Sequence, residues 1–126
     1  MIHLDANVLI SLSQVDPAAR ARVEIWLKSG ERLCVSAPGW QEFVTGPVTP
    51  SEIADTESLL LGGVVPYGKV QAEKAAEFFN LTGRRRALKF DCMIAAAAVT
   101  ADAWLATSNQ ADFAIFVPLG LKLETV

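Results

Sequence analysis

Short apolar runs alternate with helix-like patterns along the whole of this 126-residue sequence. Unbroken apolar runs of a few residues are typical of strands that are buried on both faces of a parallel sheet. They predict strands at residues 2–4, 33–35, 64–65, 104–106, 115–117 and 121–124. Between these runs, apolar residues recur at the spacing of one helix face. The alternation predicts an α/β fold, a three-layer α/β/α sandwich with a mainly parallel central sheet.

Capping residues predict where the helices begin. Asn7 is placed to cap a short first helix, and Asp16 before a proline begins the second. Residues 49–52 (Thr-Pro-Ser-Glu) form a capping box for a helix that we expect to run to about residue 61. Asp91 stands where an N-cap belongs, ahead of an alanine-rich helix reaching about residue 102. Another helix carries an apolar stripe of Ala72, Ala75, Ala76 and Phe79.

Composition is consistent with one compact domain covering residues 1–126. The hydrophobic fraction of 52% and the mean hydropathy of +0.32 suit a sheet covered by helices on both faces. No repeat or linker divides the chain, and no apolar stretch reaches the roughly 18 residues that span a bilayer. Asp5 and Asn7 interrupt the first apolar run and no basic segment precedes it, which argues against a signal peptide. We therefore expect a cytoplasmic protein with no membrane partner.

Charge and cysteine content exclude other classes of site. A formal net charge of −3 argues against a protein that coats nucleic acid nonspecifically, although an enzyme of this charge can still bind nucleic acid at a local site. Cys34 and Cys92 lack the spacing of a zinc site, so both are predicted to be buried packing residues. His3 lies inside the first predicted strand, where packing is a better interpretation than catalysis.

Four carboxylates stand where predicted strands give way to loops or helices: Asp5, Glu42, Asp91 and Asp112. The carboxyl ends of parallel strands share one edge of the sheet, and ligands bind there. Two carboxylates about 4 Å apart repel each other by about 4 kcal/mol at an effective dielectric near 20. A bound divalent cation relieves such repulsion, and oxygen ligands select Mg²⁺ or Mn²⁺ over zinc. The pattern therefore predicts a hard-metal site.

Each acid also has an ordinary structural explanation. Asp91 can serve as a helix cap, Glu42 falls off the apolar stripe of its helix, and Asp112 can stabilise a turn. Asp5 is the hardest to explain by structure alone, because an acid directly after a buried strand rarely serves packing. Thr107 and Ser108 can orient an attacking water or simply cap the local backbone.

Four ordered segments resemble the motifs of PIN-domain ribonucleases, and most closely the VapC-type toxins of bacterial toxin–antitoxin pairs. In order and spacing the match extends over essentially the whole chain, and each motif is weak alone while the ordered set is specific. The segments are LDANVLI at 4–10, WQEF at 40–43, DCMIAAAA at 91–98 and LATSNQADF at 105–113. The resemblance implies a PIN-like fold and a Mg²⁺- or Mn²⁺-dependent endoribonuclease. It also implies a homodimer and a small antitoxin that blocks the acidic pocket.

The resemblance assigns roles to individual residues. Asp5, Glu42 and Asp91 match the family's acids, with Asn7 and Thr107 as polar neighbours. Family members often carry a fourth acid where this chain has Asn109, so Asp112 is the nearest candidate for that position. The expected catalytic set is Asp5, Glu42, Asp91 and Asp112; the expected metal ligands are Asp5, Asp91 and Asp112; the supporting residues are Asn7, Thr107, Ser108 and Asn109.

A basic stretch precedes the third acid and consists of Arg84, Arg85, Arg86 and Lys89. These cations can hold RNA phosphates that the acids would otherwise repel. They can equally pair with an acidic segment of an inhibitor, or remain solvated.

Three rival functions stay in view. A Mg²⁺-dependent phosphatase of similar fold needs a second acid two residues after Asp5, where this chain has Asn7. A receiver-type signalling module needs a lysine that the Thr107 loop lacks. A catalytically degenerate PIN-like domain, which binds metal or a partner without cleaving RNA, is consistent with the Asn109 departure.

Overall fold

The computed structural model of the protein describes residues 1–126 and contains five strands, seven α-helices and two short 3-10 helices. The elements follow in the order β1 (Ile2–Leu4), α1 (Ala6–Ser13), α2 (Pro17–Lys28), β2 (Leu33–Ser36), α3 (Ala37–Thr45), α4 (Pro50–Glu57), β3 (Gly63–Val65), α5 (Lys69–Leu81), η1 (Arg86–Leu88), α6 (Lys89–Thr100), β4 (Trp104–Thr107), α7 (Gln110–Phe113), η2 (Ala114–Leu119) and β5 (Lys122–Thr125). None of the helices combines the length and the apolar character that crossing a bilayer requires.

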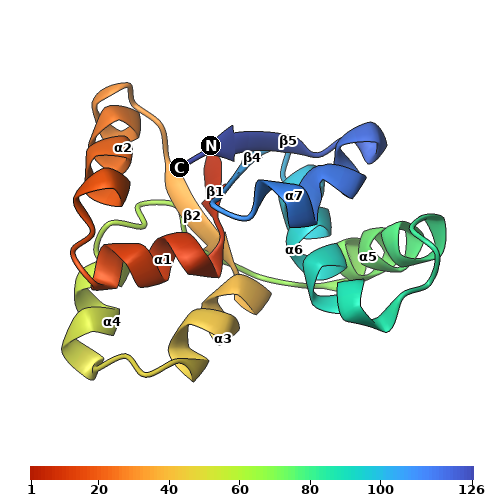
Figure 1. Ribbon diagram of the computed structural model, residues 1–126, viewed down its shortest axis with the longest axis horizontal. Helices are drawn as coiled ribbons and strands as arrows, with labels where there is room; N and C mark the ends of the chain where they lie inside the picture. The colour runs from red at the N-terminus through yellow and green to blue at the C-terminus, as the bar shows by residue number, and fades with distance from the viewer.

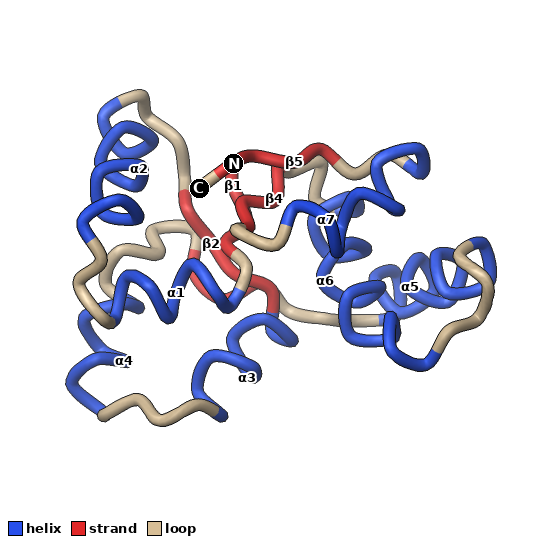
Figure 2. The backbone as a smooth tube through the Cα atoms, in the orientation of Figure 1, coloured by secondary structure: helices blue, strands red, loops and turns tan.

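All five strands run parallel in the order β3-β2-β1-β4-β5, which confirms the predicted sheet. Ile2 of β1 is in register with Leu33 of β2 and with Trp104 of β4. The chain moves outward from β1 to β2 and β3 and then returns to the other side of β1 (Figure 2). The strand order therefore reverses between β1 and β4, and this switch point is where open α/β sheets bind ligands.

Two apolar clusters form the layers on either side of the sheet. Ile2 and Leu4 pack with α1, α2 and Phe43 of α3. Leu105 packs with α5, α6, α7 and η2. Figure 1 shows α1 and α2 to one side of strands β1 and β2, and α6 followed by α5 to the other side, with α5 at the far end. Burial on both faces explains the unbroken apolar runs, and it confirms the predicted three-layer arrangement.

The starts of two functional helices differ from the sequence prediction. Asp5, not Asn7, caps α1, because its carboxylate accepts a hydrogen bond from the backbone of Ala6. Asp91 is not a cap either. Helix α6 begins at Lys89, and Asp91 lies inside its first turn. The preceding η1 turn runs directly into α6, so the helix starts earlier than a capping signal indicates.

Three other local predictions are wrong. Residues 115–117 belong to the 3-10 helix η2, which ends at Gly120 with a φ of 112°. Helix α4 ends at Glu57 rather than near residue 61. On α5 the buried residues are Ala75 and Phe78, so the apolar face is rotated from the predicted stripe, with Ala72 and Ala76 exposed. Cys34 and Cys92 are free and buried, as predicted.

Candidate functional site

Asp5 lies at the switch point and is held by three hydrogen bonds. It follows β1 directly and is only 6% exposed. Its Oδ1 accepts from the Ala6 amide at 2.8 Å, and its Oδ2 accepts from the Thr107 hydroxyl at 2.8 Å. The Asn7 side-chain amide donates to the same Oδ2 at 3.3 Å. Burial raises the pKa of Asp5, the bonds from Thr107 and Ala6 oppose that rise, and the charge of Asp112 adds to it.

Thr107 joins this acid to the loop that follows β4. Its side chain is fully buried, and its hydroxyl also accepts from the Asn7 amide at 3.2 Å and from the Asn109 backbone at 3.0 Å. The Ser108 backbone donates to Asn7 Oδ1 at 3.3 Å, while the Ser108 side chain is exposed. Asn7 and Thr107 therefore connect α1 to the β4–α7 loop through side chains a hundred residues apart.

Glu42 reaches the same region from α3. The Ser36 hydroxyl at the end of β2 accepts from the Gly39 amide at 3.2 Å and caps this helix. Partial burial raises the pKa of Glu42, and the negative charges of Asp5 and Asp91 raise it further. The local pattern of Glu42 alone is that of an ordinary surface glutamate, but in the fold its carboxylate interacts electrostatically with two of the other predicted acids.

Asp91 enters from the first turn of α6. Burial raises its pKa to about 6, and the charges of Asp5 and Asp112 contribute to the rise. A cavity of about 360 Å³ lies against it. The lining consists of Gln41, Glu42, Thr45, Phe90 and Asp91. Two of the four predicted acids therefore face one open pocket.

Asp112 completes the group from α7, where it is exposed to solvent. Its charge contributes to the raised pKa values of Asp5 and Asp91, so it lies close enough to act on both. Asn109 precedes α7 and its side chain makes no capping hydrogen bond. Contacts run from α1 to α3, from α3 to α6 and from α6 to α7, and these helices surround the site at the centre of Figure 1. The fold brings the four predicted acids into one neighbourhood.

The donor set fits a hard cation that is bound largely through water. No three His, Cys, Asp or Glu side chains stand close enough to ligate one ion directly. Magnesium commonly keeps several waters and uses only one or two carboxylates, so this spacing is compatible with it. None of the four acids forms an ion pair with a lysine or arginine. Their mutual repulsion is therefore uncompensated within the protein, and the absence of thiol or imidazole donors argues against zinc.

Gln110 is a supporting residue that the sequence analysis did not single out. Its side-chain amide donates to the Thr107 carbonyl at 2.7 Å and to the Glu124 carbonyl at 3.0 Å. These bonds fasten the start of helix α7, which carries Asp112, to the ends of strands β4 and β5. A glutamine in a polar loop carries no sequence signal for this role, because the partner carbonyl on β5 is fourteen residues away.

The predicted basic residues lie on the segment from the end of α5 to the first turn of α6, and they form no ion pair with the acids. All four are exposed, and none is paired with a carboxylate: Arg84, Arg85, Arg86 and Lys89. His3 is 1% exposed, and neither ring nitrogen has a hydrogen-bond partner in the protein. Burial lowers the pKa of His3 to about 4, so it is a neutral packing residue at neutral pH.

Comparison with known proteins gives the same fold. The family model described as PIN domain matches residues 2–116. VapBC2 from Rickettsia felis, bound to a DNA fragment from their promoter, has a TM-score of 0.74 at 16% identity over 100% of this chain and 99% of that chain. VapBC-1 from nontypeable Haemophilus influenzae has a TM-score of 0.73 at 21% identity over 99% and 98%. A toxin–antitoxin complex from Klebsiella pneumoniae has a TM-score of 0.71 at 23% identity over 90% and 91%.

No curated protein matches the sequence. At these identities the solved structures establish the fold alone, and they do not assign individual residues. The family model, in contrast, spans all of the sheet except its last strand, together with the four segments that carry the predicted acids. This chain belongs to the PIN-domain family.

Proposed function

We propose that this protein is a Mg²⁺- or Mn²⁺-dependent endoribonuclease that hydrolyses RNA phosphodiester bonds, the toxin component of a toxin–antitoxin pair. One observation carries the proposal: four carboxylates from four separate segments gather at the switch point with no cation from the protein to balance them. Such a group costs stability unless it serves a ligand of opposite charge.

In this proposal each residue of the site has a separate role. Asp5, Asp91 and Asp112 hold the ion, directly or through water. The ion supplies neutralisation of phosphate charge and activation of the attacking water. Thr107 and Asn7 fix the orientation of the Asp5 carboxylate through their hydrogen bonds. The carboxylate of Glu42, with its raised pKa, accepts the proton that the water releases.

A cleavage assay tests the proposal directly. Purified protein, freed of any bound inhibitor, is incubated with a panel of structured RNAs and Mg²⁺ or Mn²⁺, beside Asp5→Asn and Asp55→Asn. Asp55 is exposed on α4 and away from the acids, so its variant is a chemically matched control. We expect cleavage by the wild type and Asp55→Asn only. Equal activity of wild type and Asp5→Asn on every RNA contradicts the proposal.

A second function, that of a catalytically degenerate domain, is favoured by two observations. The acids do not approach closely enough for three to ligate one ion, and Asn109 stands where family members often carry an acid. In that case calorimetry detects binding of Mg²⁺ or Mn²⁺ while no RNA is cleaved. Comparison of Asp112→Asn with Asn109→Ala identifies the residue at the fourth position of the metal site, because only replacement of that residue should weaken metal binding or cleavage.

We also propose the partners that this function implies, a small antitoxin and a second copy of the chain. The related structure from Klebsiella pneumoniae is a toxin–antitoxin complex. Exposed apolar side chains are available for association, since Leu61, Val70 and Leu81 are 68%, 65% and 60% exposed. Light scattering of the purified protein alone measures self-association. The same measurement after co-expression with the product of a small adjacent gene measures association with an antitoxin.

A further inference from the structure

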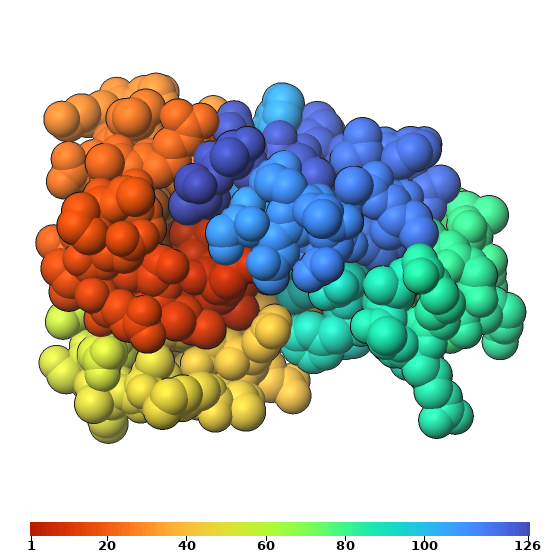
Figure 3. All heavy atoms as spheres, viewed as in Figure 1, coloured from red at the N-terminus to blue at the C-terminus, as the bar shows by residue number.

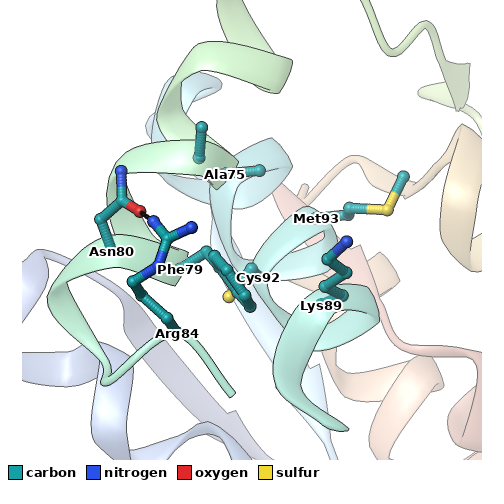
Figure 4. A pocket seen from close by; sticks show the side chains of 8 residues that line it. Ala75, Phe79, Asn80, Arg84, Lys89, Cys92 and Met93 are labelled. Carbon is teal, nitrogen blue, oxygen red and sulfur yellow. Dashed lines mark hydrogen bonds between the residues drawn. The ribbon is translucent and has the colours of Figure 1, made fainter. Parts of the chain in front are cut away.

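A second pocket lies between α5 and α6, outside the group of acids. It has a volume of about 380 Å³. Its wall is mainly apolar and its rim is cationic and amide-bearing, and it is lined by Ala75, Ala76, Phe79, Asn80, Arg84, Lys89, Cys92 and Met93 (Figure 4). In the space-filling view, α5 and the segment after it form a projecting end of the molecule, drawn in green and teal (Figure 3).

The end of α5 builds one side of this pocket. Gly83 has a φ of 88°, and the Arg84 amide donates to the Phe79 carbonyl at 2.9 Å, which is the reversal of a Schellman turn. The reversal returns the Arg84 side chain over the helix, where it bonds to the Asn80 amide oxygen. Its guanidinium carbon lies 5.4 Å from the centre of the Phe79 ring, and Lys89 Nζ lies 5.6 Å from the same centre. Two cations are therefore fixed at the rim beside an aromatic ring.

The charges at this rim have no partner within the protein. Arg84 and Lys89 form no ion pair, and neither do Arg85 and Arg86 on the connecting segment. The acids of α5 do not neutralise them, because Glu73 and Glu77 are paired with lysines of the same helix. The pocket therefore offers an apolar wall and positive charge to a ligand that combines a flat apolar group with an anion.

The pocket also stands next to the acids. Successive residues of a helix are rotated by about 100°. Lys89, Cys92 and Met93 point to this pocket, while Phe90 and Asp91 point to the acidic one. The first turn of α6 therefore separates the two pockets, and a strand laid across that turn reaches both.

From this arrangement we propose that the α5–α6 pocket binds one nucleotide of a single-stranded RNA whose neighbouring phosphate lies at the acids. The base packs against Phe79 and Met93, and Arg84 and Lys89 hold its phosphate. Stacking on aromatic and guanidinium groups with phosphates on cations is how proteins bind single strands. The inference rests on the proposed function for the position of the neighbouring phosphate, but binding in the pocket is testable without cleavage.

Charge favours RNA over the two other occupants of an apolar pocket. A second copy of this chain carries a net charge of −3. If it docked through the same face, its α5 would bring no free acid to these cations, because Glu73 and Glu77 are already paired with lysines. An acidic peptide satisfies the cations, but it leaves unexplained why they stand one helical turn from a group of carboxylates that repels peptide acids. A nucleic-acid strand satisfies both features, because its phosphates need cations on approach and a bound metal at the acids.

The test uses full-length protein with Asp91→Asn as the common background, so that RNA is bound and not cut. Fluorescence anisotropy measures binding of labelled oligouridine and oligoadenosine in Mg²⁺. Ala76→Trp fills the pocket from an exposed helix position, and Ala72→Trp is the matched control one turn earlier and outside the lining. Circular dichroism and light scattering verify the fold and the oligomeric state of each variant. A further variant, Arg84→Gln, is measured over a range of salt concentrations.

We expect Ala76→Trp to weaken binding of at least one oligonucleotide by about tenfold or more, and Ala72→Trp to leave it unchanged. Arg84→Gln should lower the slope of log affinity against log salt by about 0.7, the contribution of one phosphate contact on a single strand. Equal affinities of the two tryptophan variants, or no RNA binding at all, overturn the inference. A change of oligomeric state in Ala76→Trp with unchanged RNA affinity also overturns it and assigns the pocket to a contact between copies.

The two proposals fail separately. If wild type cleaves RNA but the pocket variants bind RNA as tightly as the Asp91→Asn background protein, the endoribonuclease proposal stands and the pocket proposal falls. If wild type cleaves no RNA while Ala76→Trp still loses affinity, the pocket binds nucleotides in a domain that is not a nuclease.

Discussion

Replacing Asp91 by asparagine should stabilise the metal-free protein. Asp91 lies in the first turn of α6 beside the acidic pocket, and burial followed by the charges of Asp5 and Asp112 raises its pKa from 3.8 to about 6. Because the folded pKa lies above the unfolded one, ionised Asp91 lowers the free energy of unfolding. This cost is absent below about pH 4, grows as the pH rises through 6, and is complete above about pH 7.

The magnitude follows from the size of the shift. About two pKa units correspond to about 3 kcal/mol. Asp91 is only half-buried, so solvent screening reduces this to about 1–2 kcal/mol. An acid in the first helical turn also gains about 0.5 kcal/mol from the helix dipole, which asparagine forfeits. The net expectation is a gain of about 1 kcal/mol for Asp91→Asn, or a rise in Tm of about 3–6 °C.

Urea and thermal unfolding followed by circular dichroism measure this gain in EDTA between about pH 4 and pH 8. Asp55→Asn on α4 makes the same chemical change at an exposed site and should shift stability by less than about 0.5 kcal/mol. Saturating Mg²⁺ should reverse the order, because an ion at a hundred times its Kd stabilises wild type by about 2.7 kcal/mol and the variant by less.

Two results refute the reasoning. If Asp91→Asn is less stable than wild type in EDTA at neutral pH, Asp91 is a structural residue that the fold holds ionised. If the difference between the two proteins is the same at low and neutral pH, it does not come from ionisation of the carboxylate.

Three further substitutions test the surroundings of the site. His3→Leu should raise the free energy of unfolding by about 1 kcal/mol, because it removes two buried ring nitrogens without partners; a loss measured by urea unfolding means that the ring is hydrogen-bonded. Gln110→Glu should lower the Tm more than Gln110→Ala does, because a carboxylate cannot donate to the carbonyls of Thr107 and Glu124; equal Tm values mean that the bonds do not form. Thr107→Val should cost about 2 kcal/mol and lower RNA cleavage, whereas Thr107→Ser should retain most of both; if serine behaves like valine, the hydroxyl bond to Asp5 is not the reason.

Local signals in the sequence determined much of the fold. Thr49 and Glu52 form both bonds of the capping box, each at 3.1 Å, because a cap needs only residues within one turn. Asp16 caps α2 for the same reason. The strand at 2–4 was predicted correctly and the strand at 104–107 to within one residue, because burial on both faces requires an apolar run in whatever sheet the strand joins.

Features that depend on packing could not be predicted from the sequence. The apolar run at residues 115–117 could pair as a strand, but in the fold it lies in η2, with Phe116 buried against Phe78 and Phe113. On α5 the sequence offers two neighbouring phenylalanines, and only the position of α6 decides that Phe78 enters the core while Phe79 borders a pocket. Apolar residues on adjacent helix faces satisfy the same periodicity, so the pattern cannot choose between them.

For the candidate site, the sequence by itself determined which residues are acidic, which of them follow strands, and that a parallel sheet gathers strand ends at one edge. Tertiary structure alone decided how those residues stand toward one another. Glu42, six residues beyond β2, is brought to Asp5 and Asp91 by the direction of α3, and no local rule encodes that direction. The same holds for the pocket on the other side of α6. Electrostatic coupling depends on distance in space, whereas a sequence records only distance along the chain.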